Sequence, residues 1–272
     1  MTRIAELKNY LREKSSAGIA LAFSGGVDSS FLLSVLKELC DEKPFPLQAL
    51  NMRTVFQRED EVAEARQIAS SCGVPLAEFT CDPLELPQLR NNPADRCYWC
   101  KRHIFSVFKD HAEKNHLGVI MDGTNGDDLH VYRPGRRALR ELGVVSPLAE
   151  LGFTKAEIRH QAAERGLKCA KKPAMPCLAT RFAYGTELTP ERIRQVAQGE
   201  ELLRKLLPAD IDLRLRVQDR IARIEVSPDE LETVLRNRTG ISAGLKKLGF
   251  EFITLDLEGF RSGCYDQKEV KI

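Results

Sequence analysis

The part of the sequence that most constrains the fold is a seven-residue loop, Ser24-Gly25-Gly26-Val27-Asp28-Ser29-Ser30. It follows an apolar run over residues 19–23 and opens a helical pattern over residues 30–39. Two glycines allow a tight turn, and the N–H groups of this turn and of the helix start can bind an anion. The loop lacks the spacings of a Walker loop and of a dinucleotide-binding loop. We expect a phosphate site here, the alternative being a tight turn capped by Ser or Asp.

The order Ser-Gly-Gly-x-Asp-Ser resembles the PP-loop of ATP pyrophosphatases. Loops of that family hold the pyrophosphate of ATP while an acyl or amide oxygen is adenylated. The resemblance implies that ATP binds at residues 24–30. Asp28 and the loop backbone would then hold the pyrophosphate together with Mg²⁺.

Composition excludes several classes of protein. The 272 residues suffice for one large domain or two ordinary ones, and 43% apolar residues suffice for a core. No apolar run approaches the ~20 residues of a membrane span, and residues 1–11 lack the apolar region of a secretory signal. We therefore expect a cytoplasmic protein that does not enter a membrane. The near balance of 41 basic and 39 acidic residues argues against a nucleic-acid partner.

Strand and helix patterns alternate along the first half of the chain. The expected strands cover residues 19–23, 45–52, 74–80 and 119–121, and the expected helices cover 4–14, 30–39, 59–72 and 101–116. This order predicts an α/β fold with a parallel sheet and helices on both faces. Ligands of such sheets bind beyond the carboxyl ends of the strands, where the 24–30 loop and residues 122–125 would both lie.

The second half has a different rhythm. It predicts helices at residues 154–165, 190–206, 229–236 and 241–248, a hairpin from strands 212–218 and 222–226, and a strand at 250–255. This order indicates a small α/β C-terminal domain. The boundary falls between residues 171 and 189, and we divide the chain into domains 1–175 and 176–272.

A second candidate segment, Asp122-Gly123-Thr124-Asn125-Gly126-Asp127-Asp128, follows the last strand of the first half. Mg²⁺ prefers one or two carboxylates together with phosphate oxygens, so Asp128 is a candidate ligand beside the phosphate loop. Thr124 and Asn125 could donate to phosphate or ribose. The alternative is a polar turn after a strand.

Three of the eight cysteines stand out. Cys97 and Cys100 have the C-x-x-C spacing of half a metal site, and Cys177 would make three thiolates, enough to hold a [4Fe–4S] cluster with one iron open. The alternative is a reduced C-x-x-C without metal and an unrelated loop cysteine. Cys177 also fits a nucleophile, because the cations of Lys171, Lys172 and Arg181 nearby favour a thiolate.

Arg214 and Arg216 are two residues apart on an expected strand, so they share one face. Together with Arg181 they could bind a substrate phosphate. The alternative is a solvated strand face.

These segments together resemble the LarE-type ATP-dependent sulfur transferases. The resemblance runs from about residue 2 to 266 and rests on the two loops already described and on the segments 95–101, 176–181 and 256–263. Members sulfurate a pyridinium dicarboxylate mononucleotide, a precursor of the nickel-pincer cofactor of lactate racemase. The resemblance implies that ATP adenylates a substrate carboxylate and that sulfur then replaces AMP. It also implies a homo-oligomer, contacts with other proteins of cofactor assembly, and Lys101 among the substrate-binding residues.

Two sulfur routes occur in that family. In one, a single cysteine matching Cys177 attacks the acyl-adenylate and gives up its own sulfur. In the other, three cysteines hold an iron–sulfur cluster that carries an extra sulfide. The presence of Cys97 and Cys100 beside Cys177 favours the cluster route.

Three alternatives remain from the sequence. A PP-loop tRNA thiolase can also use three cysteines and a cluster, although no RNA-binding module is visible here. An ammonia-dependent amide synthetase of the same superfamily would leave the cysteines idle. A nucleotide-binding regulatory module would bind ATP without turnover.

Overall fold

The structure is a computed structural model, which describes residues 2–129, 133–172, 176–208, 211–261 and 265. The chain divides into two compact units. The first comprises Met1–Asp82 and Asp95–Ala174, and the second comprises Pro83–Ala94 and Met175–Ile272. None of the described helices is both long enough and apolar enough to cross a membrane.

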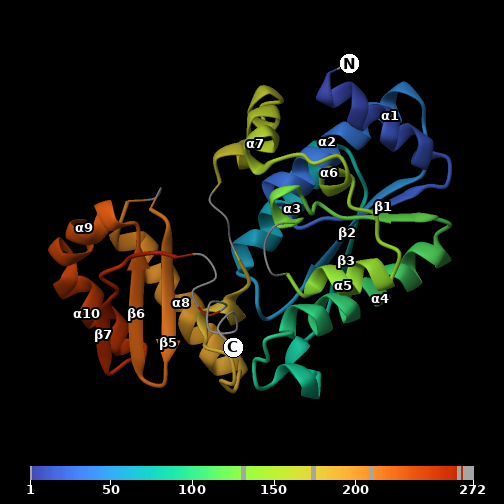
Figure 1. Cartoon of the computed structure of the whole chain (residues 1–272). Helices are drawn as coiled ribbons and strands as arrows, with labels where there is room; N and C mark the ends of the chain where they lie inside the picture. Colours follow the sequence, from blue (N-terminus) through green and yellow to red (C-terminus); the bar gives the residue numbers. More distant parts are fainter. Residues whose placement is uncertain (1, 130–132, 173–175, 209–210, 262–264, 266–272) are drawn as a thin grey trace. The chain divides into compact units, whose positions relative to one another are not determined.

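The first unit is a parallel α/β sheet with strand order β3-β2-β1-β4 (Figure 1). Its strands are β1 (Ile19–Ala22), β2 (Leu47–Arg53), β3 (Leu76–Thr80) and β4 (Val119–Met121). Its helices are α1 (Arg3–Ser15), α2 (Val27–Glu42), α3 (Glu59–Ser71), α4 (Arg96–Lys114), α5 (Gly135–Glu141), α6 (Pro147–Glu150) and α7 (Lys155–Glu164). The predicted parallel sheet is therefore confirmed.

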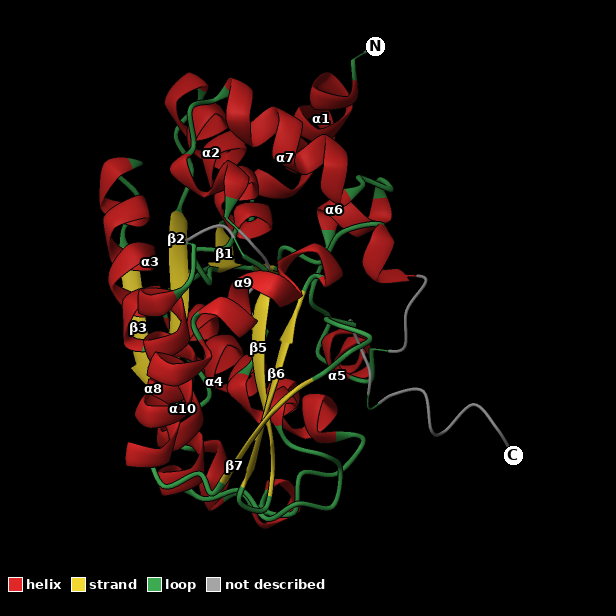
Figure 2. Ribbon diagram, turned by 90° about the vertical axis from the view of Figure 1, so that its left-hand side faces the viewer, coloured by secondary structure: helices red, strands yellow, loops and turns green. Residues whose placement is uncertain are grey.

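Successive side chains of a strand point to opposite faces of the sheet, and here both faces carry apolar side chains that helices cover. Ile19 and Leu21 of β1 belong to the core on one face, whereas Ala20 belongs to the core on the other. The first core joins the sheet to α1, α2 and α7, which Figure 2 shows gathered together. The second core joins it to α4 and α5. Such a sheet has buried residues on both faces, as parallel sheets require.

Two helices begin earlier than the sequence predicts. Helix α2 starts at Val27 rather than residue 30, so four of the seven residues of the glycine loop are already helical. Helix α4 starts at Arg96 rather than residue 101, because Asp95 anchors its first turn. The backbone carbonyl of Asp95 accepts from Tyr98, and its carboxylate accepts from the Trp99 indole at 2.9 Å. The expected helix start after Cys100 is therefore wrong, and both cysteines lie within the first turns of α4.

The second unit has a small mixed sheet of strand order β5-β6-β7. Its strands are β5 (Leu213–Gln218), β6 (Ile221–Val226) and β7 (Phe252–Leu255), and its helices are α8 (Pro190–Leu206), α9 (Leu231–Arg236) and α10 (Arg238–Lys247). Strands β5 and β6 form the predicted antiparallel hairpin, and β7 runs parallel to β6. Helices α8 and α10 pack against each other and against β5 and β7 respectively (Figure 1).

The segment 83–94 groups with the second unit, although the sequence analysis placed it in the first domain. Asn92 is fully buried and donates from its side-chain amide to the carbonyls of Phe182 and Ala183, at 3.0 and 2.8 Å. The N–H of Leu188 donates to the carbonyl of Arg90 at 2.7 Å. These hydrogen bonds join residues far apart in the sequence, so local sequence patterns do not predict them.

A buried ion pair connects α8 of the second unit to the loop before it. Glu200 is fully buried and accepts from Arg181 through both carboxylate oxygens, at 2.7 and 3.1 Å. The same carboxylate accepts from the backbone N–H of Leu215 on β5 at 3.2 Å. Burial alone would raise the pKa of Glu200, but the charge and hydrogen bonds of Arg181 outweigh it and lower that pKa.

We expect Glu200→Gln to lower the free energy of unfolding by roughly 3–5 kcal/mol at pH 7, because it leaves the buried Arg181 without its counter-charge. Because the folded pKa is depressed, the wild-type pair contributes stability above the unfolded pKa, near 4.5, and loses it as pH falls through the folded pKa. Urea denaturation should therefore show a smaller loss of stability on acidification for the variant.

Glu201→Gln is the matched control, since Glu201 is the next residue and pairs with Lys205 on the surface, with side chains 63% and 69% exposed. It should cost less than about 1 kcal/mol. Equal losses for the two variants would contradict a structural role for the buried pair.

Candidate functional site

The glycine loop between β1 and α2 has the backbone that its sequence predicts. Gly25 has φ of +75°, and a Cβ built there would lie 3.0 Å from the Cα of Ala65, so only glycine fits. Gly26 is the N-cap of α2 and offers no side chain to the first turn of that helix. Unoccupied N–H groups at a helix start are a ready anion site.

Serine side chains fix the shape of this loop. The Ser24 hydroxyl accepts from the N–H of Gly26 at 3.3 Å, and the Ser29 hydroxyl donates to the carbonyl of Gly26 at 3.2 Å. Ser24 and Ser29 also lie within hydrogen-bond distance of each other, at 3.3 Å. Ser30 is fully buried, and its hydroxyl has no hydrogen-bond partner among the described residues.

The loop after β4 packs directly against this turn. A Cβ built on Gly123 would lie 2.9 Å from the backbone nitrogen of Ser29 and 3.3 Å from the carbonyl carbon of Asp28. Strands β1 and β4 are neighbours in register, with Leu21 opposite Met121. The structure thus brings the two predicted loops together at the carboxyl edge of the sheet.

The carboxylate of Asp122 accepts hydrogen bonds that hold the loop after β4 in place. Asp122 is buried, and its carboxylate accepts from the Thr124 hydroxyl at 2.5 Å and from the Ser146 hydroxyl at 2.6 Å. The ammonium of Lys101 lies 3.8 Å from the same carboxylate. Lys101 therefore lies on the first unit beside the loop, whereas the three candidate arginines belong to the second unit.

Asp128 already has partners of its own. Its carboxylate accepts from the N–H of Asn125 at 3.3 Å, and the Asn125 side chain accepts from the N–H of Asp128. Arg133 lies 2.9 Å from the other carboxylate oxygen. These contacts close a turn, the structure that the alternative interpretation of the segment predicts.

Lys155 contacts the glycine loop, and the sequence analysis did not predict this contact. Its ammonium lies 2.5 Å from one carboxylate oxygen of Asp28, while the other oxygen of Asp28 is buried without a hydrogen-bond partner among the described residues. Lys155 begins α7, and its backbone N–H donates to Asp127 at 2.8 Å. The cap pattern of Thr154 and Glu157 marked a helix start but gave no sign that its first residue reaches the glycine loop.

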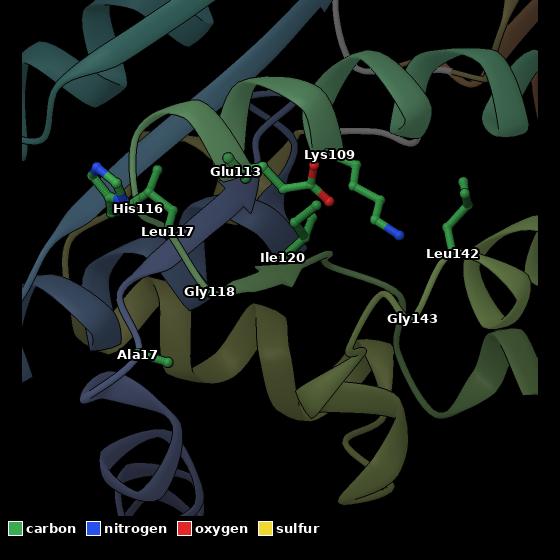
Figure 3. A pocket seen from close by; sticks show the side chains of 10 residues that line it. Ala17, Lys109, Glu113, His116, Leu117, Gly118, Ile120, Leu142 and Gly143 are labelled. Carbon is green, nitrogen blue, oxygen red and sulfur yellow. The ribbon is translucent and has the colours of Figure 1, made fainter.

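The first unit also has a pocket that does not include the glycine loop. It measures about 370 Å³ and is lined by Lys109, Glu113 and His116 among others (Figure 3). Ala17 and Gly118 border it, and they precede β1 and β4 respectively. The pocket therefore lies at the amino ends of the strands, at the opposite edge of the sheet from the glycine loop.

The cysteines divide between the two units. Cys97 and Cys100 are three residues apart on α4, so they share one face of the helix, and both are half-buried and outside any disulfide. Cys177 is half-buried in the second unit, so the meeting of the three sulfurs remains a prediction. Within the described ranges, no three His, Cys, Asp or Glu side chains form a metal-binding group. Residues 173–175 of the Cys177 segment and 262–263 of the last segment lie outside the described residues.

Arg181 holds the Cys177 loop. It is 2% exposed, and beyond Glu200 it donates to the carbonyl of Pro176 at 2.8 Å and to the hydroxyl of Thr180 at 2.9 Å. The Thr180 hydroxyl in turn donates to the carbonyl of Cys177 at 2.7 Å. The guanidinium of Arg181 therefore donates to protein oxygens in this structure. These contacts favour a role for Arg181 in positioning Cys177 rather than in binding a phosphate directly.

Arg214 and Arg216 share a face of β5, but that face is buried. They are 4% and 6% exposed, so the alternative of a solvated strand face is wrong. Arg216 pairs with Glu225 at 3.0 Å and donates to the carbonyl of Thr180 at 2.5 Å. Burial, together with the nearby charge of Arg181, lowers the pKa of Arg214 to about 10.

Comparison with known proteins covers both units. A family model described as a PP-loop domain matches residues 1–130. Pyridinium-3,5-bisthiocarboxylic acid mononucleotide synthase of Lactiplantibacillus plantarum is 34% identical over 263 residues, which are 96% of this chain and 91% of that protein. An uncharacterised protein of Synechocystis is 33% identical over 96% of both chains, and one of Methanocaldococcus jannaschii is 31% identical over 96% of this chain and 98% of its own.

The similarity to the Lactiplantibacillus plantarum synthase covers 96% of this chain, whereas the PP-loop model ends at residue 130. The chain therefore belongs to the family of LarE-type ATP-dependent sulfur transferases within the PP-loop superfamily.

Proposed function

We propose that this enzyme adenylates a carboxylate of a pyridinium dicarboxylate mononucleotide and converts it to a thiocarboxylate. The observation that carries the proposal is the contact of two polar loops at the carboxyl edge of β1 and β4, in a chain similar over nearly its whole length to a named synthase of such a product. Attack of the carboxylate on the α-phosphate of ATP would form an acyl-adenylate and release pyrophosphate. A sulfur nucleophile would then displace AMP.

The first unit would bind ATP. The N–H groups at the start of α2 and the hydroxyls of Ser24 and Ser29 would contact the pyrophosphate, and Thr124 and Asn125 would reach it or the ribose. Asp28 fits Mg²⁺ because one of its carboxylate oxygens is buried and lacks a hydrogen-bond partner among the described residues. Asp128 fits less well, since Asn125 and Arg133 engage both of its oxygens. When bound, Mg²⁺ would neutralise phosphate charge.

The second unit would bind the phosphate of the substrate. Its buried charged residues, within the described part, are three arginines and two glutamates: Arg181, Arg214, Arg216, Glu200 and Glu225. Arg181 and Arg216 each pair with one of the glutamates. A guanidinium is planar and can donate two parallel N–H bonds to a phosphate, which supports a phosphate beside Arg214. Lys101 would contribute from the first unit.

The sulfur would pass through Cys97, Cys100 and Cys177. Their three thiolates suit a [4Fe–4S] cluster by donor chemistry, and the shared helix face of Cys97 and Cys100 fits two ligands of one cluster. When bound, such a cluster would supply an iron open to an external sulfur. Arg181, Thr180 and Arg216 would hold the backbone of the Cys177 loop in place.

We expect pyrophosphate release to require both ATP and the pyridinium mononucleotide. Asp28→Ala should abolish this release while far-ultraviolet circular dichroism stays unchanged, because it removes the carboxylate proposed for Mg²⁺. Adding tRNA in place of the mononucleotide should release nothing. Release with tRNA, or with ammonia required, would support a tRNA thiolase or an amide synthetase instead. ATP binding without any release would indicate a regulatory module.

Arg214→Ala should raise the substrate constant of the mononucleotide roughly ten- to hundredfold, since a charge-assisted hydrogen bond contributes about 1.5–3 kcal/mol. The affinity for ATP should not change. Arg220→Ala is the control, because Arg220 lies in the turn of the same hairpin and is 71% exposed. An unchanged substrate constant for Arg214→Ala would reject the assignment.

Cys97→Ala, Cys100→Ala and Cys177→Ala should each lose iron and activity together after anaerobic reconstitution. Cys72→Ala, which removes a half-buried free thiol at the end of α3, should lose neither. The cluster route is wrong if reconstituted protein binds no iron. It is also wrong if Cys97→Ala and Cys100→Ala remain active while intact protein loses the mass of hydrogen sulfide at Cys177.

A further inference from the structure

The glycine loop carries an acidic side chain but no basic one. Asp28 places a carboxylate in the first turn of α2, beside the N–H groups proposed for the pyrophosphate. Phosphate oxygens would repel this carboxylate unless a cation lies between them. Walker loops contain a lysine that contacts the phosphates, but residues 24–30 contain no basic side chain.

Lys155 brings a cation to that position from a distant part of the chain. Its ammonium contacts Asp28 at 2.5 Å, across 127 residues of sequence. The side chains of Lys155 and Asp28 are 33% and 22% exposed, so the pair is partly open to a ligand. A lysine ammonium has three N–H donors and can contact a carboxylate and a phosphate at once.

The backbone of Lys155 is fixed by the same loop that packs on the glycine turn. Its N–H donates to Asp127, and the N–H of Gly126 donates to the carbonyl of Phe153 at 2.7 Å. A Cβ built on Gly126 would lie 3.0 Å from the carbonyl carbon of Gly152. Thr154 and Glu157 form a reciprocal cap that holds the first turn of α7. The position of the lysine is therefore set before any ligand arrives.

We propose that Lys155 is an ATP-binding residue whose ammonium bridges Asp28 and the pyrophosphate group of ATP. This inference rests on the proposed function. The two oxygens of Asp28 then have different roles: one contacts Lys155, and the buried one, which has no hydrogen-bond partner among the described residues, would be left for Mg²⁺. As the bond to the α-phosphate breaks, the ammonium stabilises the negative charge that develops on the departing pyrophosphate.

The test compares ATP with AMP as probes, because AMP lacks the pyrophosphate that Lys155 would contact. We expect Lys155→Met to weaken binding of a non-hydrolysable ATP analogue roughly ten- to hundredfold, by calorimetry on the full chain. The affinity for AMP should stay within about twofold. Lys155→Arg, which keeps the charge, should recover part of the loss for the ATP analogue.

Lys37→Met is the matched control. Lys37 forms an ion pair of the same 2.5 Å length with Asp41, toward the other end of α2, and the variant should bind both nucleotides as the wild type does. If Lys155→Met does not fold, Lys155→Gln carries the same test, because it keeps a donor for Asp28 but no charge.

Two results would overturn the inference. Unchanged binding of the ATP analogue would show that Lys155 does not contact the pyrophosphate. Equal losses for the ATP analogue and AMP would show that Lys155 only supports the loop. Failure of the proposed function looks different, because the wild type itself would then bind no ATP or release no pyrophosphate with the mononucleotide.

Discussion

The lack of a side chain at Gly123, which faces the backbone nitrogen of Ser29, is the constraint on which the site in the first unit depends. A side chain at Gly123 would collide with the turn that begins α2, so the two loops can meet only because this residue has none. The parallel pairing of β1 with β4 brings both loops to one edge, and the contact then fixes their separation. Asp28 can reach Lys155 only because the second loop, so placed, also docks the start of α7. One steric requirement thus joins three segments that are far apart in the sequence.

Local patterns predicted most of the first unit because its strands are short apolar runs followed by helical periodicity. They failed where a tertiary contact decides the outcome. The start of α4 depends on Asp95 accepting from the Trp99 indole, and no spacing rule selects that contact over a start five residues later. Helices α5 and α6 are short and were not predicted. Lys155 was missed for a related reason: its helix cap is visible in the sequence, but its partner lies 127 residues away.

In the second unit the sequence predicted which residues share a face but not whether that face is buried. Alternating arginines and leucines are typical of a strand with one solvated side, and Arg214 and Arg216 would then be ordinary surface residues. Arg216 is buried together with its counter-charge Glu225, which lies on the neighbouring strand β6. The pattern of a strand contains no information about counter-charges supplied from elsewhere. The same limit applies to residues 83–94, whose place in this unit rests on Asn92.

A buried ion pair is a costly way to support a loop, since apolar packing of the same volume would often be as stable. The advantage of the ion pair here is that it fixes the orientation of the Arg181 side chain. The guanidinium of Arg181 is planar, and with Glu200 fixed on one edge it can donate to Pro176 and Thr180 only in one orientation. The carbonyl of Cys177 is then held through Thr180, so the thiol sits on a backbone that cannot rotate freely. The reaction proposed here delivers sulfur to a reactive adenylate, and such a reaction needs its donor held in place more than it needs extra stability.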